Sequence, residues 1–277
     1  MITSGSLTWL FCPADRPDRY ARATASAPVV IFDLEDAVEP DRKAAAREAL
    51  LDASHGLDPT RTVVRINPLG THEADADLAA LRDTPLRSLM VPKAERADQL
   101  DQLSERWKTI ALCETAAGVL HAAELVSHEA CVAITWGGQD LALSVGADDP
   151  RDATGRFRAF ARHARMQVLY AAAAAGKPAI DTVWILLDDA VGLDAEAREA
   201  AANGFAAKMA IHPSQAASIR AAFRPQPERV EQARAILQAS EAAGAGASRA
   251  DGLMLDRPVI EQARAVLARE AAAAEER

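Results

Sequence analysis

The chain has 277 residues, of which 49% are hydrophobic, and a formal net charge of -9. This length allows a large buried core, in one big domain or two small ones. The negative charge argues against nucleic-acid binding, which needs clustered Lys and Arg, and no stretch approaches the about 20 apolar residues of a membrane span. We therefore expect a soluble, cytoplasmic protein. Its cysteines, Cys12, Cys113 and Cys131, lack metal-ligand spacing and are expected to be reduced.

Short apolar runs alternate with longer Ala-rich amphipathic stretches, which is typical of a parallel α/β protein. Eight runs are predicted as strands, at residues 7–11, 29–34, 62–66, 88–91, 109–113, 132–136, 179–183 and 207–211. Eight strands, each followed by a helical stretch, fit a closed (β/α)8 TIM barrel better than an open doubly wound sheet. No Gly-x-Gly-x-x-Gly turn follows the first strand, which weakens a dinucleotide-binding fold. We predict a barrel over residues 1–224, with its chemistry where the strands end.

Charged residues follow most of the predicted strands, and these are the first site candidates. In chain order they are Asp15 and Arg16; Asp33, Glu35, Asp36, Arg42 and Lys43; Arg65; Lys93; Asp181; and His212. Arg65 lies within an apolar strand, where a guanidinium is costly unless it meets a carboxylate from the protein or the substrate. Lys93 has an ordinary alternative as a solvated loop charge, and His212 as a side chain that hydrogen-bonds a backbone carbonyl.

Two neighbouring strands each lead to a carboxylate. The fifth ends at Glu114, and the sixth passes through Gly137 and Gly138 to Asp140. An Ala- and Leu-rich helical stretch joins them, so the two strands should lie parallel and side by side. Carboxylates that converge at one sheet edge suit Mg2+, with the substrate completing its coordination shell. Asp140 could instead only cap the helix that follows.

Residues 225–277 are predicted to form a C-terminal helical extension. The Gly/Ala/Ser stretch at residues 244–248 predicts a hinge, and a turn and an Ala-rich helix follow it. Asp256 precedes Arg257 and Pro258, where it could only cap the last helix. The hinge could also let the tail bring Asp256 to an active site as an acid or base, in its own chain or in a neighbour. The two roles are compatible.

Nine motifs occur in order along the chain. They are LFCPADRPDR, VVIFDLEDAV, VVRINPLGT, LMVPKAE, IALCETAAGVLHAAEL, ITWGGQDLA, AIDTV, GFAAKMAIHPSQ and DGLMLDRPVIEQA. Together they resemble the citrate lyase beta-subunit-like family of citryl-, malyl- and citramalyl-CoA lyases, within the malate synthase and class II pyruvate aldolase superfamily of barrels. Nine motifs in register are far more specific than any one of them.

The resemblance implies roles for particular residues. Glu114 of the E-T-x-x-G motif and Asp140 of the G-x-x-D-L motif would bind Mg2+, with Glu114 also next to the substrate. Arg65 of the V-R-x-N motif would contact the carboxylate and carbonyl oxygens of the substrate. Three acidic residues of the D-L-E-D turn would support the metal waters and orient Arg65, and they are Asp33, Glu35 and Asp36.

The resemblance also implies an oligomer. Asp256 of the D-x-P motif would reach a neighbouring subunit's site, so we expect a homo-oligomer, a trimer or a hexamer. Arg16 and Lys43 match positions near CoA or the substrate. Two residues depart from the family pattern: Gln139 stands where many members have an acid, and Ala14 replaces a common Gly. Gln139 leaves the detailed choice of substrate open.

The implied reaction is cleavage of a 3-hydroxyacyl-CoA thioester, such as malyl-, citramalyl- or hydroxymethylglutaryl-CoA, to acetyl-CoA and a 2-oxo acid or other carbonyl compound. One alternative is a pyruvate aldolase acting on free aldehydes, but that branch places a His where this chain has Asp36. Another is a non-catalytic subunit that binds CoA or a carrier protein, against which the retained charged residues argue. The acyl group, the stereochemistry and the physiological direction do not follow from these residues.

Overall fold

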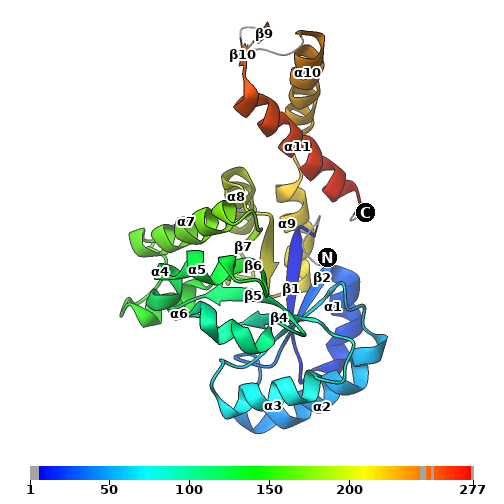
Figure 1. The fold of residues 1–277 in the computed structure, drawn as a ribbon, viewed down its shortest axis with the longest axis vertical. Helices are drawn as coiled ribbons and strands as arrows, with labels where there is room; N and C mark the ends of the chain where they lie inside the picture. Colours follow the sequence, from blue (N-terminus) through cyan, green and yellow to red (C-terminus); the bar gives the residue numbers. More distant parts are fainter. Residues whose placement is uncertain (1–5, 244–247, 251–252, 276–277) are drawn as a thin grey trace.

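The structure is a computed structural model that describes residues 6–243, 248–250 and 253–275. At its centre eight parallel strands form a closed barrel in chain order, and β1 pairs with β8 to close it (Figure 1). The strands are β1 (Thr8–Pro13), β2 (Val29–Asp33), β3 (Thr62–Arg65), β4 (Ser88–Val91), β5 (Lys108–Cys113), β6 (Cys131–Trp136), β7 (Ala179–Asp181) and β8 (Ala207–Ala210). The predicted (β/α)8 barrel is confirmed.

Helices surround the barrel (Figure 1). They are α1 (Tyr20–Ser26), α2 (Lys43–Ala53), α3 (His72–Leu81), α4 (Ala116–Leu120), α5 (Ala122–Ser127), α6 (Gly138–Ser144), α7 (Ala159–Ala174), α8 (Ala190–Asn203) and α9 (Pro213–Phe223), with 3-10 helices at Pro17–Arg19, Pro40–Arg42, Ser54–Gly56 and Ala97–Leu103. Capping side chains stabilise the first turns of two of these helices. The Thr71 and Thr115 hydroxyls accept N–H hydrogen bonds from the first turns of α3 and α4. Pro213 opens α9, where its missing N–H is harmless.

Alternate strand residues face two different cores, because side chains alternate across a strand. In β2, Val29 and Ile31 belong to a cluster inside the barrel, whereas Val30 and Phe32 join the larger cluster that includes helix residues. The inner cluster consists of Trp9, Val29, Ile31, Val63, Met90, Ile110, Leu112, Ala133, Ile180, Ala207 and Met209. The barrel interior is therefore filled, and a ligand must bind at its end rather than within it.

The strand register brings the predicted site residues to one edge of the barrel. Asp33 at the end of β2 lies directly beside Arg65 at the end of β3. Cys113 of β5 lies beside Trp136 of β6, so the residues that follow them, Glu114 and Gly137, leave the barrel side by side. Asp33 and Arg65 are 32 residues apart in sequence, and Glu114 and Gly137 are 23 residues apart. The strand register nevertheless brings both pairs to the same end of the barrel.

The C-terminal extension consists of α10 (Pro227–Ala243), the antiparallel strands β9 (Ser248–Ala250) and β10 (Leu253–Leu255), and α11 (Arg257–Glu275). Figure 1 shows α10 and α11 extending from the barrel as an arm, with the two strands at its far end. The helices join through a small apolar cluster that includes Val230 and Val266. Near the end of α11, Arg269 donates to the Ala201 carbonyl oxygen at 2.8 Å, which ties the arm to α8.

Two predictions concern this arm, a hinge and a domain boundary. The predicted hinge falls mainly on residues 244–247, which lie outside the described residues. Its last residue, Ser248, belongs to β9, where it pairs with Leu255, and the hinge stays a prediction. The expected domain boundary at residues 224–225 falls between α9 and α10 and stays a prediction.

Among the residues described, no helix is long and apolar enough to cross a membrane.

Candidate active site

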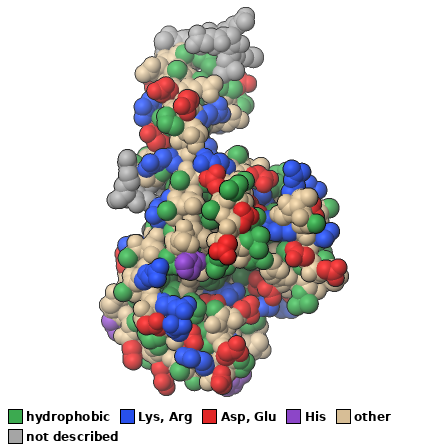
Figure 2. All heavy atoms as spheres, turned by 180° about the vertical axis from the view of Figure 1, so that it is seen from behind, with side chains coloured by type: hydrophobic (Ala, Val, Ile, Leu, Met, Phe, Trp, Pro, Cys, Tyr) green, Lys and Arg blue, Asp and Glu red, His purple; other side chains and the backbone are tan. Residues whose placement is uncertain are grey.

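A cavity of about 370 Å3 lies at the carboxyl end of the barrel. Its wall includes five charged residues that the sequence analysis singled out, and they are Asp33, Asp36, Arg65, Glu114 and Asp140. Because they lie at or just after the ends of four strands, β2, β3, β5 and β6, the barrel itself brings them together. The surface beyond the cavity carries no large basic field on the face that Figure 2 shows, where acidic and basic side chains are intermingled.

Arg65 is held by carboxylates of the D-L-E-D turn. Its Nε and Nη2 donate to the two Asp33 carboxylate oxygens at 2.8 and 2.6 Å, and Nη1 lies 2.7 Å from Glu35 Oε2. Burial disfavours the charged guanidinium, but Asp33 and Glu35 outweigh it and raise the pKa of Arg65. The hydrogen bonds to Asp33 use two of its five N–H groups, and the others include donors available at the cavity wall. The prediction that Arg65 meets carboxylates of the protein is confirmed.

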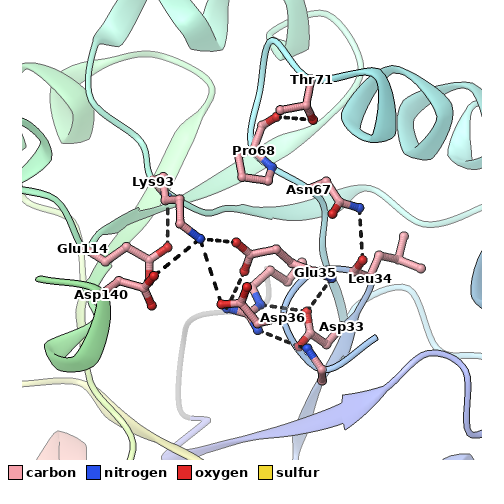
Figure 3. A network of polar contacts seen from close by, with 12 residues as sticks. Asp33, Leu34, Glu35, Asp36, Asn67, Pro68, Thr71, Lys93, Glu114 and Asp140 are labelled. Carbon is pink, nitrogen blue, oxygen red and sulfur yellow. Dashed lines mark hydrogen bonds and ion pairs between the residues drawn. The ribbon is translucent and has the colours of Figure 1, made fainter. Parts of the chain in front are cut away.

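Lys93 lies at the centre of the site rather than in a solvated loop. Its ammonium hydrogen-bonds Glu35 and lies 3.5 Å from Asp140 Oδ1 and 4.0 Å from Asp36 Oδ2. Its backbone N–H donates to Glu114 Oε1 at 3.0 Å. Figure 3 shows the side chain between the two groups of carboxylates. Its φ of +48° is a left-handed conformation that costs a non-glycine residue about 1 kcal/mol or more.

The environment of Glu114 and Asp140 fits a hard divalent cation. Glu114 is 2% exposed, and its burial and the repulsion of the nearby Asp140 carboxylate raise its pKa to about 8, although Arg65 and Lys93 oppose this shift. Gly137 leaves room for Glu114, since a Cβ there would lie 2.6 Å from Glu114 Oε2. No third His, Cys, Asp or Glu of the described chain completes a metal cage, so the substrate and water would supply the remaining ligands.

The capping alternative for Asp140 is not observed. Gly137 is the N-cap residue of α6, and no side chain caps that helix. The His212 ring also bonds the backbone, but it accepts the Ser214 N–H at the start of α9 instead of bonding the expected carbonyl oxygen. Asp181 is also structural: it is fully buried and accepts hydrogen bonds from Trp136, Arg165 and Lys208.

Four predicted binding or catalytic residues do not line the cavity, and one of them is Glu35, which instead contacts Arg65 and Lys93. Arg16 is on the surface and pairs with Asp18. The Lys43 ammonium donates to the Leu34 and Glu35 carbonyl oxygens and to the Asn67 side chain, which occupies all three of its N–H groups. Asp256 caps α11 by accepting the Val259 N–H at 3.1 Å, at the far end of the arm (Figure 1). Their roles toward a substrate stay predictions.

Arg151 and Phe157 line the cavity although the sequence analysis did not select them. They lie between α6 and α7 and face each other across an isolated β-bridge. This segment has no apolar periodicity and carries several other charged residues, so a single Arg in it gives no spacing signal. The only available sign was its position after a predicted barrel strand.

The fold and the site define a (β/α)8-barrel protein with two converging carboxylates and a fixed guanidinium at its active end. The chain belongs to the HpcH/HpaI aldolase/citrate lyase family, whose model matches residues 7–213. The predicted membership of a lyase family is therefore confirmed.

Relatives in this family cover most of the chain. A citrate lyase subunit beta-like protein of Mycobacterium tuberculosis is 47% identical over 94% of both chains. The human mitochondrial citramalyl-CoA lyase is 29% identical over 84% of this chain and 76% of its own. A crystal structure of M. tuberculosis CitE with magnesium, acetoacetate and coenzyme A has a TM-score of 0.92 at 46% identity, covering 98% of this chain and all of the other. Its magnesium is the cofactor predicted from the sequence.

Proposed function

We propose that this chain is a Mg2+-dependent carbon–carbon lyase that cleaves a 3-hydroxyacyl-CoA thioester to acetyl-CoA and a 2-oxo acid or other carbonyl compound. The observation that carries this proposal is that Glu114 and Asp140 share a cavity wall with Arg65, whose donors are partly unused. Two carboxylates that can hold a metal ion, next to a fixed guanidinium, suit a substrate that chelates the metal at one end and develops negative charge at the other. The relatives named for citrate lyase and citramalyl-CoA lyase support this chemistry.

The reaction begins at the substrate's 3-hydroxyl group. Mg2+ held by Glu114 and Asp140 would polarise the hydroxyl and carboxylate oxygens and make the hydroxyl more acidic. Asp36, which lies on the cavity wall with its side chain 55% exposed, accepts the hydroxyl proton in this proposal. The oxygen then forms the carbonyl of the 2-oxo acid as the carbon–carbon bond breaks, and the electron pair passes to the thioester as an enolate.

Arg65 and Asp256 act on that enolate. Arg65 directs its free N–H groups at the developing oxyanion, and its contacts with Asp33 and Glu35 keep it in place without reorganisation. Asp256 then protonates the enolate carbon, which yields acetyl-CoA. Because the start of α11 lies at the far end of the arm, this step needs Asp256 from a neighbouring subunit in a homo-oligomer, with a trimer or hexamer expected (Figure 1).

The test is release of acetyl-CoA from malyl-, citramalyl- and hydroxymethylglutaryl-CoA, with and without Mg2+. The proposal predicts product from at least one thioester, lost on chelation and in Glu114→Gln. Arg198→Ala, which alters an exposed ion pair on α8, is the control and should keep full activity. Absence of product from every thioester would contradict the proposal, and activity on free aldehydes would then favour a pyruvate aldolase.

A further inference from the structure

Arg151 is a cavity-wall cation held in one orientation. Its side chain is 10% exposed, and its Cζ lies 3.7 Å from the Phe157 ring centroid and 4.4 Å from the Trp184 ring centroid. Contacts with two aromatic rings fix the plane of a guanidinium and reduce the entropy it loses when it binds a ligand. Pro150 lies next to Gly138 and so places this wall close to the loop that carries Asp140.

A buried network holds Arg151 from behind. Its Nη1 donates to the Gly155 carbonyl oxygen at 2.9 Å and lies 2.6 Å from Glu196 Oε2. The other Glu196 oxygen accepts from Lys208 at 2.9 Å, and Lys208 also bonds Asp181 at 3.1 Å. Glu196 is thus shared between two cations and neutralises Arg151 only in part.

The buried group as a whole carries excess positive charge. Arg151, Arg165 and Lys208 face two buried carboxylates, those of Asp181 and Glu196. The one further carboxylate in contact, Glu199, is 63% exposed and touches Arg165 rather than Arg151. A buried cation that its own carboxylates neutralise only in part favours an anionic ligand.

Arg151 also has donors left for such a ligand. Among the described residues its Nε and Nη2 have no hydrogen-bond or ion-pair partner, whereas all three nitrogens of Arg65 meet carboxylates. Arg65 and Arg151 are the two cations on the described cavity wall, so Arg151 is the one with most of its donors unused. Adjacent N–H groups of a guanidinium match the two oxygens of a carboxylate.

We propose that Arg151 binds a second carboxylate of the substrate, away from the metal, and so selects substrates that release a dicarboxylic 2-oxo acid. The inference rests on the proposed function, which places the 2-oxo acid end of the substrate at Glu114 and Asp140. The phosphates of CoA are a poorer match, because several charges would meet one deeply set guanidinium between aromatic rings. Arg151 would therefore be a specificity residue rather than part of the bond-breaking chemistry.

Equilibrium binding separates this role from a structural one. Calorimetry in Mg2+ would compare fresh oxaloacetate with pyruvate and with 4-methyl-2-oxopentanoate, which has nearly the shape of oxaloacetate but no second carboxylate. We expect wild-type protein to bind oxaloacetate more tightly than 4-methyl-2-oxopentanoate. In Arg151→Gln oxaloacetate should bind about 10- to 100-fold more weakly, as for loss of a charged hydrogen-bonded pair, while pyruvate affinity changes less than about threefold. Arg151→Lys should keep part of the preference.

Arg198→Ala, which removes an exposed ion pair on α8, is the control, because it leaves Arg151 and all its contacts in place, so the preference should persist. Equal weakening of pyruvate and oxaloacetate in Arg151→Gln and Arg151→Lys would overturn the proposal, as would a loss confined to CoA binding. Failure of wild-type protein to bind any 2-oxo acid with Mg2+ would instead contradict the proposed function itself, and the inference with it.

Discussion

At the scale of single residues, Gly137 controls the space around Glu114. A Cβ at position 137 would lie 2.6 Å from Glu114 Oε2, a distance that side chains do not tolerate. Because Glu114 is buried and its Oε1 is held by the Lys93 N–H, the carboxylate has little room to retreat. Gly137→Ala should therefore weaken Mg2+ binding by at least about tenfold. That loss equals about 1.4 kcal/mol, which lies in the lower half of typical overpacking costs.

Gly138→Ala is the matched control for this prediction. A Cβ there would meet Pro150 at 3.5 Å, which is ordinary contact, so Mg2+ affinity should stay close to that of wild-type protein. Calorimetric titration of the purified variants measures both. Equal Mg2+ affinities for the two variants would contradict the role given to Gly137.

Glu114 also makes metal binding depend on pH. Its pKa in the fold is about 8, against about 4.3 in an unfolded chain. Between these values the folded chain holds a proton that the unfolded chain has lost, so this group lowers the stability of the metal-free fold as pH rises through that window. Mg2+ binds the ionised carboxylate, so its affinity should rise about tenfold per pH unit below pH 8 and then level off. Titrations from pH 6 to 9 measure this slope, and a flat profile would contradict it.

At the scale of elements, the buried network ties β7 and β8 to α7 and α8. Lys208 is fully buried between Asp181 and Glu196 and also donates to the Thr182 carbonyl oxygen at 2.6 Å. Removing one partner of a buried ionic group leaves uncompensated charge. Lys208→Met should lower the free energy of unfolding by about 3–5 kcal/mol, measured by urea denaturation.

An exposed ion pair on α8 provides the control for the Lys208→Met prediction. Arg198 pairs with Asp194 one turn away, and both side chains are more than 40% exposed. Arg198→Ala should cost less than about 1 kcal/mol, because water already screens that pair. If the two variants unfold at the same urea concentration, the network does not stabilise the fold as described.

The elements also show which features a sequence can predict. Apolar runs and their order indicated all eight strands, because each must fill one barrel position with alternating side chains. Strand ends then indicated Glu114, Asp140 and Arg65, since parallel strands end at one edge. The contacts of Arg151 and Lys93 did not follow, because they depend on a loop path and on a left-handed backbone position. Composition alone predicts a hinge that includes Ser248, and it does not reveal the pairing of Ser248 with β10.

At the scale of the whole molecule, α11, which Asp256 caps, begins at the end of the arm that lies away from the barrel (Figure 1). If a neighbour's Asp256 completes each site, Asp256→Ala and Glu114→Gln subunits should each be inactive alone but partly active when co-assembled. With equal, random mixing, about a quarter of the sites would combine an intact Glu114 with an intact Asp256. Acetyl-CoA release by the co-expressed mixture measures this. A mixture as inactive as its parents would place both residues in one chain.

The most direct measurement of the central claim is product identity from the best thioester substrate in Mg2+. Mass spectrometry of the quenched reaction would quantify acetyl-CoA, free CoA, the 2-oxo acid and the hydroxy acid. Carbon–carbon cleavage predicts acetyl-CoA and the 2-oxo acid in equal amounts, with the thioester bond intact. Free CoA and the hydroxy acid as first products would show hydrolysis of the thioester instead, and would contradict the lyase assigned to Glu114, Asp140 and Arg65.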